Sequence, residues 1–357
     1  IDVRINGDRP FDIRVHDDRF YRRVLAQGFL GLGESYMDGW WDCDRIDEMI
    51  ARVVRGDLES RVGVSLKDMW MTLFAKFVNM QAGGRAFKVG EQHYDVGNDL
   101  YTRMLDRRMV YTCGYWLNAK TLDEAQEAKL DLVCRKIGLE PGEKVLDLGC
   151  GWGSFAQYAA ENYGAEVTGL TVSRDQVRHG KEMCKDLPVE LRLQDYRTID
   201  GTYDRVVSIG LLEHVGYKNY GEYMKVVDRT LKDDGIAFIH CIGNNKSVST
   251  GNAWTTKYIF PNSMLPSLAQ ITRAMEDTFV LEDLHNIGEH YDPTLMAWHE
   301  NFEQAWPELK EAYGERFYRM WRFYLLTSAG GFRGRNIQLW QMVMTKKGRP
   351  QPDCRVS

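Results

Sequence analysis

Strand-like and helix-like patterns of apolar residues alternate through the middle of the chain. Short apolar runs predict buried strands at residues 144–148, 165–170, 189–194, 203–209 and 235–242. Helical spacing predicts helices between and before them, at residues 121–137, 152–163, 173–186 and 217–231. Strands that alternate with helices at this interval predict an α/β fold with a doubly wound, mostly parallel sheet.

The flanking regions have other patterns. Residues 1–15 alternate like short strands, and residues 20–77 have helical spacing, with breaks expected at Gly31-Leu32-Gly33 and at Gly39. Residues 265–330 are predicted to be mostly helical, and residues 337–345 to form a last strand. The glycine pair within residues 81–85 predicts a linker. We therefore expect a smaller, mainly helical domain over residues 1–85 and the α/β domain over residues 86–357.

Composition narrows the class of protein. Of the 357 residues, 44% are hydrophobic and 27% are charged, as in an ordinary soluble globular protein, and the net charge of −5 disfavours a nucleic-acid binder. No apolar run approaches the ~20 residues of a transmembrane helix. The seven cysteines are scattered without a Cys-x-x-Cys pair, which gives no support for a metal site or disulfides and indicates a reducing cytoplasm.

A glycine-rich turn is expected directly after the strand at residues 144–148. It contains Gly149, Gly151 and Gly153. A nicotinamide site needs Gly-x-Gly-x-x-Gly, but Ser154 occupies the third position, and the next strand ends in Gly169-Leu170-Thr171 without an acidic residue. A dinucleotide site is therefore disfavoured.

The sequence Asp-x-Gly-x-Gly-x-Gly at residues 147–153 resembles the first motif of class I S-adenosylmethionine-dependent methyltransferases. The resemblance implies a binding site for S-adenosylmethionine, with the loop beside the amino-acid part and sugar of the cofactor and Asp195 near the adenine. The implied contacts are Tyr111, Thr112, Asp147, Gly149, Cys150, Gly151, Asp195 and Tyr196. Because the usual acid after the second strand is missing, the ribose contact stays open, with Thr171 and Gln176 as polar candidates.

Further blocks resemble bacterial cyclopropane-fatty-acyl-phospholipid synthases and span nearly the whole chain. They lie at residues 31–41, 93–99, 111–116, 213–216, 257–261, 291–298 and 338–341. The resemblance implies transfer of the methyl group of S-adenosylmethionine onto the cis double bond of an acyl chain in a membrane phospholipid.

That reaction requires a base in a pocket without water, because ring closure removes one proton from the transferred methyl group. In the family that base is a bound bicarbonate ion, and the resemblance places its site at Cys113, Glu213, His240, Ile242 and Tyr291. The pattern is compatible with this, since Glu213 and His240 fall near the carboxyl ends of predicted parallel strands. Without the resemblance, His240 would be an ordinary core histidine and Cys113 simple packing.

Residues 314–357 form the most basic stretch, with nine Lys and Arg against Glu315 and Asp353, and aromatic residues between the arginines. This mixture suits anionic lipid headgroups. The alternative is a helix with an aromatic core face and a solvated arginine face. From the resemblance we expect a cytoplasmic protein peripheral to the inner face of the bacterial membrane, a homodimer, and an N-terminal domain that helps to bind lipid or a second subunit.

Three rival functions remain open. Relatives of this type of domain methylate small amines, although they are expected to lack the full bicarbonate set and the N-terminal region. A related lipid enzyme would stop at a methyl-branched or methylene product. A lipid-binding module without catalysis would leave the glycine turn and Glu213 without a purpose.

Overall fold

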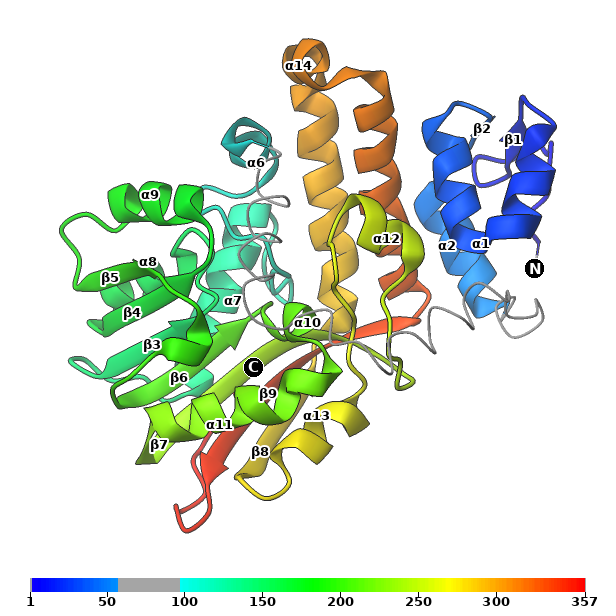
Figure 1. Ribbon diagram of the computed structural model, residues 1–357. Coiled ribbons are helices and arrows are strands. Elements are labelled where there is room, and N and C mark those ends of the chain that lie inside the picture. The colour runs from blue at the N-terminus through cyan, green and yellow to red at the C-terminus, as the bar shows by residue number, and fades with distance from the viewer. Residues whose placement is uncertain (1, 57–96, 357) are drawn as a thin grey trace.

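A seven-stranded sheet organises the larger part of the molecule (Figure 1), in a computed structural model that describes residues 2–56 and 97–356. Its strand order is β5-β4-β3-β6-β7-β9-β8. The bounds are β3 Lys144–Leu148, β4 Glu166–Thr171, β5 Val189–Leu193, β6 Tyr203–Ile209, β7 Leu231–Asn244, β8 Phe279–Asn286 and β9 Ile337–Lys346. Strands β3 to β7 run parallel, whereas β9 is antiparallel to β7 and β8. The predicted fold class is confirmed.

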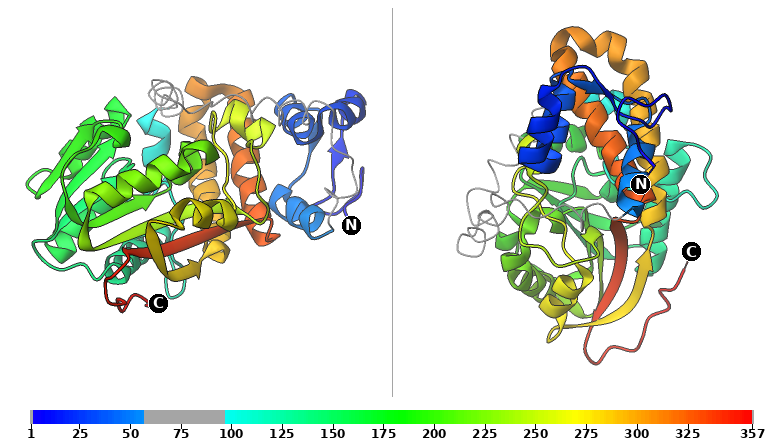
Figure 2. Two further views of the ribbon diagram at one scale, coloured as in Figure 1. Left: turned by 60° about the horizontal axis from the view of Figure 1, so that its bottom comes forward. Right: turned by 90° about the vertical axis from the view of Figure 1, so that its right-hand side faces the viewer.

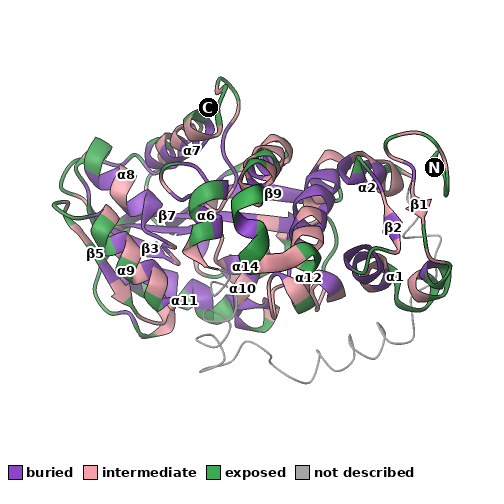
Figure 3. Cartoon of the chain, turned by 90° about the horizontal axis from the view of Figure 1, so that it is seen from above, coloured by how far each residue is buried: buried purple, intermediate pink, exposed green. Residues whose placement is uncertain are grey.

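Helices cover both faces of this sheet (Figure 2). They are α7 Leu122–Lys136, α8 Ser154–Tyr163, α9 Arg174–Met183, α10 Leu212–Val215, α11 Tyr220–Thr230 and α13 Leu268–Met275. Two further helices pack away from the sheet: α6 Asn98–Met104 contacts α14, and α12 Ala253–Tyr258 contacts α1. One apolar cluster joins the sheet to α7 and α8, and another joins it to α11 and α13. The strands between these layers are largely buried, as the purple β3, β7 and β9 in Figure 3 show.

The sheet differs from the prediction at two places. Strand β7 begins at Leu231, where the preceding helix was still expected. Residues 265–330 are mostly helical, as predicted, but they also contain β8, a strand that the sequence analysis did not predict. Among the described residues, β8 is an edge strand that pairs with β9 alone, and its register shifts between Leu281 and Asp283. A strand that buries one face and is interrupted in this way leaves a weak alternating pattern.

The N-terminal segment consists of β1 Arg14–Val15, α1 Arg19–Met37, β2 Trp41–Asp42 and α2 Ile46–Arg55. The predicted helix break at Gly31 and Gly33 is wrong: α1 kinks at Gly28, whose φ is 56°, and continues to Met37. A Cβ atom on Gly33 would clash with the ring of Trp254, so this glycine permits close packing of α1 against α12. The break at Gly39, with φ 74°, is confirmed. The predicted linker at residues 81–85 lies outside the described residues.

Helix α14, Tyr291–Arg333, folds back at Gly314 into two arms that stand between the sheet and the N-terminal helices (Figure 1). On the second arm, Trp321 and Phe323 are buried. Arg319 donates to the Trp41 carbonyl over 2.8 Å and Arg322 to the Asp44 carbonyl over 2.9 Å. The interpretation of this stretch as a headgroup-binding surface is therefore not supported, because its aromatic face is core and its arginines hold the N-terminal segment.

Among residues 2–56 and 97–356, no helix is both long enough and apolar enough to cross a membrane.

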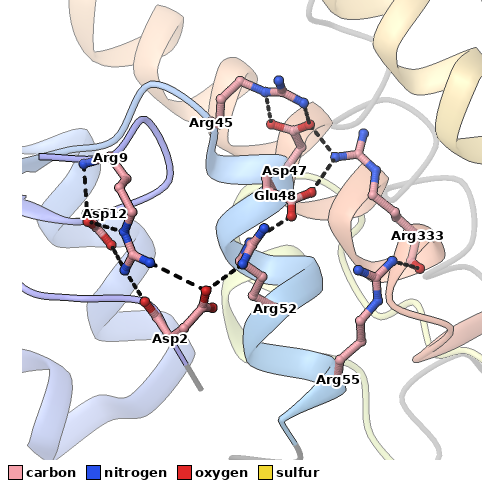
Figure 4. A network of polar contacts seen from close by, with 9 residues as sticks. All are labelled: Asp2, Arg9, Asp12, Arg45, Asp47, Glu48, Arg52, Arg55 and Arg333. Carbon is pink, nitrogen blue, oxygen red and sulfur yellow. Dashed lines mark hydrogen bonds and ion pairs between the residues drawn. The ribbon is translucent and has the colours of Figure 1, made fainter. Parts of the chain in front are cut away.

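Arg333, at the end of α14, joins the two parts of the molecule (Figure 4). Its guanidinium donates to Asp47 of α2 over 2.5 Å and, through two bonds of 2.8 Å, to Asp292 near the start of α14. Asp47 is fully buried and is also bound by Arg45. Burial alone would raise the pKa of Asp47, but the bonds from Arg45 and Arg333 hold it at about 2. The carboxylate is therefore ionised and depends on its partners.

We expect Arg333→Met to lower the free energy of unfolding by about 3 kcal/mol, because it leaves a buried carboxylate with only one of its two cationic partners. Urea denaturation at neutral pH measures the change. The matched control is Arg178→Met, whose pair with Asp175 is exposed and should matter by less than about 0.5 kcal/mol. Equal stability of the two variants would contradict the structural role given to Arg333.

Candidate active site

The glycine turn follows β3 at the carboxyl edge of the sheet. Gly149, Gly151 and Gly153 have φ angles of 81°, 56° and 88°, a backbone region that favours glycine. The N–H groups of Gly149 and Cys150 donate to the Leu170 carbonyl over 3.0 and 2.8 Å, which ties the turn to β4. The turn is thus fixed at the edge where open parallel sheets bind ligands.

Asp147, in β3, shares the interior with Lys129 of α7, which the sequence analysis did not select. Both side chains are buried. Burial raises the pKa of Asp147 to about 7 against the opposing charge of Lys129, and burial lowers the pKa of Lys129 to about 8. The Lys129 ammonium donates to Thr112 Oγ1 over 3.0 Å, and Gln126 Nε2 donates to the Thr112 carbonyl over 2.7 Å. Helix α7 therefore holds Thr112, an expected cofactor contact.

The two polar candidates for the ribose contact lie together at the end of β4. Thr171 Oγ1 donates to Gln176 Oε1 over 2.6 Å, and the Gln176 Nε2 is buried without a hydrogen-bond partner among the described residues. A buried amide donor without an acceptor is rare in folded proteins and indicates a ligand position. Both residues therefore fit a polar part of the cofactor.

Asp195 and Tyr196 follow β5. Burial would raise the pKa of Asp195, but hydrogen bonds from Arg197 lower it below its ordinary value. Asp195 Oδ1 accepts from the Arg197 N–H over 3.0 Å and from its Nε over 2.9 Å. The Tyr196 ring packs edge-on against Tyr223, with centroids 5.8 Å apart. The Arg197 hydrogen bonds and the contact with Tyr223 therefore hold the loop after β5 in place.

Glu213 lies in α10, directly after β6, and is 5% exposed. Its Oε1 accepts from the Ile242 N–H over 2.7 Å, while its Oε2 is buried without a partner among the described residues. Burial raises the pKa of Glu213 to about 7. The Ile242 N–H is therefore already bound to the Glu213 carboxylate in this structure.

His240 lies two residues earlier on β7, opposite Gln341 of β9. Its Nδ1 is 3.4 Å from Gln341 Nε2, and its Nε2 is buried without a partner in the described part of the chain. Burial, and then the charge of Lys129, lower the pKa of His240 well below its ordinary value. The imidazole is neutral. The next residue, Cys241, packs in an apolar cluster, and burial followed by the nearby Glu213 charge raises the pKa of its thiol.

Cys113 and Tyr291 belong to one apolar cluster, into which Ile242 also packs. The Tyr291 ring lies 4.5 Å from Phe332 and 6.0 Å from Trp298, centroid to centroid. The pKa of Tyr291 is raised well above its ordinary value by burial and then by nearby Tyr324, Cys113 and Glu213. Cys113, Tyr291 and Ile242 therefore share one buried region, Glu213 contacts it through the Ile242 N–H, and His240 lies beside it on β7.

Aromatic rings line this region. Tyr111 OH donates to Tyr324 OH over 3.0 Å, and the Tyr111 ring lies 5.2 Å from Trp298. Phe260, which follows α12, lies 5.8 Å from Tyr324 and 5.7 Å from His214. These rings keep water from the carboxyl edge of β6 and β7, which explains the shifted pKa values of Glu213 and His240.

We expect Glu213→Gln to stabilise the fold at pH 8 by up to about 3 kcal/mol, because the wild-type carboxylate must be ionised in an apolar site. The folded pKa is raised, so the gain should shrink as pH falls from about 7 towards 4.5, where both states bind the proton. Urea denaturation at several pH values measures it. Glu222→Gln, at an exposed position of α11, serves as the control. A gain that did not vary with pH would contradict the burial of charge.

Comparison with known proteins places this site in a family. The chain is 51% identical over 96% of its length to cyclopropane-fatty-acyl-phospholipid synthase of Escherichia coli K12, covering 90% of that protein. It is 30% identical to tuberculostearic acid methyltransferase UfaA1 of Mycobacterium tuberculosis, over 93% of this chain and 82% of the relative.

Among solved structures, mycolic acid cyclopropane synthase CmaA1 complexed with SAH and CTAB superposes with a TM-score of 0.68 at 29% identity. The match covers 73% of this chain and 98% of that one. The sequence profile described as mycolic acid cyclopropane synthetase matches residues 81–342. The chain therefore belongs to the mycolic acid cyclopropane synthetase family of S-adenosylmethionine-dependent methyltransferases.

Proposed function

We propose that this protein is a cyclopropane-fatty-acyl-phospholipid synthase that uses bicarbonate as its base. It transfers the methyl group of S-adenosylmethionine to the cis double bond of an unsaturated acyl chain in a phospholipid. The likeness to the Escherichia coli enzyme over nearly the whole chain supports the reaction. The observation that carries the site is the buried Glu213 carboxylate, with one oxygen bound to a backbone N–H and the other without a partner among the described residues.

Each step of the proposed reaction conserves atoms and electrons. The π electron pair of the alkene forms a bond to the methyl carbon as the carbon–sulfur bond breaks, which yields S-adenosylhomocysteine and a carbocation. The transferred methyl group then loses one proton, and the released electron pair closes the ring. When bound, bicarbonate supplies the oxygen base for that proton. Aromatic faces such as those of Tyr111 and Trp298 stabilise a nearby cation and exclude the water that would trap it.

The residues present fit a small oxyanion. Two buried polar atoms, Glu213 Oε2 and His240 Nε2, have no partner in the described part of the chain. Glu213 can accept a hydroxyl hydrogen, and neutral His240 can donate from Nε2 when Gln341 donates to Nδ1. Cys113 and Tyr291 complete the set, while Ile242 acts by fixing the Glu213 carboxylate.

We also propose a domain division, an oligomeric state and a location for the enzyme. We assign catalysis to residues 86–357 and an accessory role to residues 1–85. We also infer a homodimer that acts at the cytoplasmic face of the membrane. The resemblance to bacterial synthases supports these assignments.

Purified protein incubated with liposomes of unsaturated phospholipid and labelled S-adenosylmethionine should yield acyl chains that gain one CH2 and lose the double bond. Mass spectrometry of the released chains measures both changes. A methyl-branched or methylene product would overturn ring formation. Label confined to headgroup nitrogen would identify an amine methyltransferase instead.

Glu213→Gln should lower turnover by about a hundredfold or more, because the group that orients the base is lost. The affinity for S-adenosylmethionine should change little, since Glu213 lies outside the glycine turn. Equilibrium dialysis and steady-state rates separate the two effects, with Glu222→Gln as control.

Removal of carbonate from the buffers should slow the wild type, and an unchanged rate would contradict the role of bicarbonate.

A further inference from the structure

The hydroxyl of Thr294 joins two segments of the active site that are far apart in the sequence. Thr294 is fully buried in the first turn of α14, three residues after Tyr291. Its Oγ1 donates to the His290 carbonyl over 2.7 Å. It accepts from the Gly114 N–H over 3.1 Å and from Trp116 Nε1 over 2.9 Å. One hydroxyl has one donor and two acceptor positions, and all three are in use.

The segment that Thr294 holds is residues 112–116, which have no regular secondary structure. A second bond joins the same elements, since the Trp116 N–H donates to His290 Nδ1 over 3.1 Å. On the other side, α7 binds Thr112 through Gln126 and Lys129. Cys113 lies between the two attachments, and its Sγ is 3.9 Å from Thr294 Oγ1. The position of Cys113 is therefore set by α7 and by Thr294.

We propose that Thr294 is a positioning residue, whose hydroxyl fixes the Cys113 peptide relative to Tyr291 and so sets the side of the anion site opposite Glu213 and His240. The inference rests on the proposed function, because it assumes that Cys113 and Tyr291 face the bound anion. Glu213, His240 and Ile242 lie at the ends of β6 and β7 and are aligned by the sheet and by the bond between Glu213 and Ile242. Cys113 and Tyr291 lie outside the sheet, and the bonds of Thr294, together with the Trp116–His290 bond, set the position of one relative to the other.

The position requires a hydroxyl, not only a side chain of this size. Valine has nearly the shape of threonine but would leave the buried Gly114 N–H and the half-buried Trp116 Nε1 without this acceptor. Serine keeps the three hydrogen bonds and loses only a methyl group. The pair of substitutions therefore separates alignment from packing.

The test compares Thr294→Val and Thr294→Ser with wild type in the liposome assay, at varied concentrations of S-adenosylmethionine and bicarbonate. Thr294→Val should lower kcat by about a hundredfold and raise the apparent KM for bicarbonate, with little change in the dissociation constant of S-adenosylmethionine. Bicarbonate should raise the unfolding temperature of the wild type, and this rise should be lost in Thr294→Val. Thr294→Ser should recover most of both.

Two further variants keep the test decisive. Thr230→Val removes another fully buried hydroxyl, one that bonds only to carbonyls of its own helix α11, and should behave as wild type. Trp116→Phe removes one of the two donors to Thr294 and should shift kcat and the bicarbonate KM in the same direction, but less. If Thr294→Val does not fold, this variant tests the inference.

Three results would overturn the positioning role. They are unchanged bicarbonate kinetics in Thr294→Val and Trp116→Phe, equal loss in Thr294→Ser and Thr294→Val, or a parallel loss of S-adenosylmethionine binding. Failure of the proposed function gives a different result, because wild type itself would then form no cyclopropane product or show no response to bicarbonate.

Discussion

A carboxylate kept away from water at the carboxyl edge of the sheet is the constraint on which the site depends. Burying the Glu213 charge is costly, and the cost is offset in part by the Ile242 N–H. That N–H is available because β7 reaches its end beside the loop after β6. The parallel sheet therefore supplies the geometry, and the aromatic side chains around it supply the low polarity that the chemistry requires.

A second pair of buried charged groups lies between β3 and α7. Asp147 and Lys129 are both buried, and their pKa values are shifted towards the neutral forms. Each offsets part of the other's dehydration, and Lys129 also binds Thr112. The buried Lys129 ammonium thus holds the segment that contains Cys113, in addition to any contact that it makes with a ligand.

The sequence was sufficient for the central strands but not for the contacts between distant segments. Strands β3 and β6 have the expected bounds, because each contains a short apolar run that is buried at the centre of the sheet. The edge strand β8 buries one face and was missed. Lys129 could have been noticed, since positions 125, 129, 132 and 136 share the buried face of α7. Thr294 could not, because its partners lie about 180 residues away and its own pattern is that of any helical threonine.

The Arg333 guanidinium connects the N-terminal segment to the first turn of α14. It touches Asp47 on one side and, on the other, Asp292, the neighbour of Tyr291. Arg333 therefore ties α2 to the first turn of α14, in addition to the direct packing of α2 against Gly330 of the second arm. The N-terminal segment and the turn that contains Tyr291 thus share one ionic contact, although the two are about 240 residues apart in the sequence.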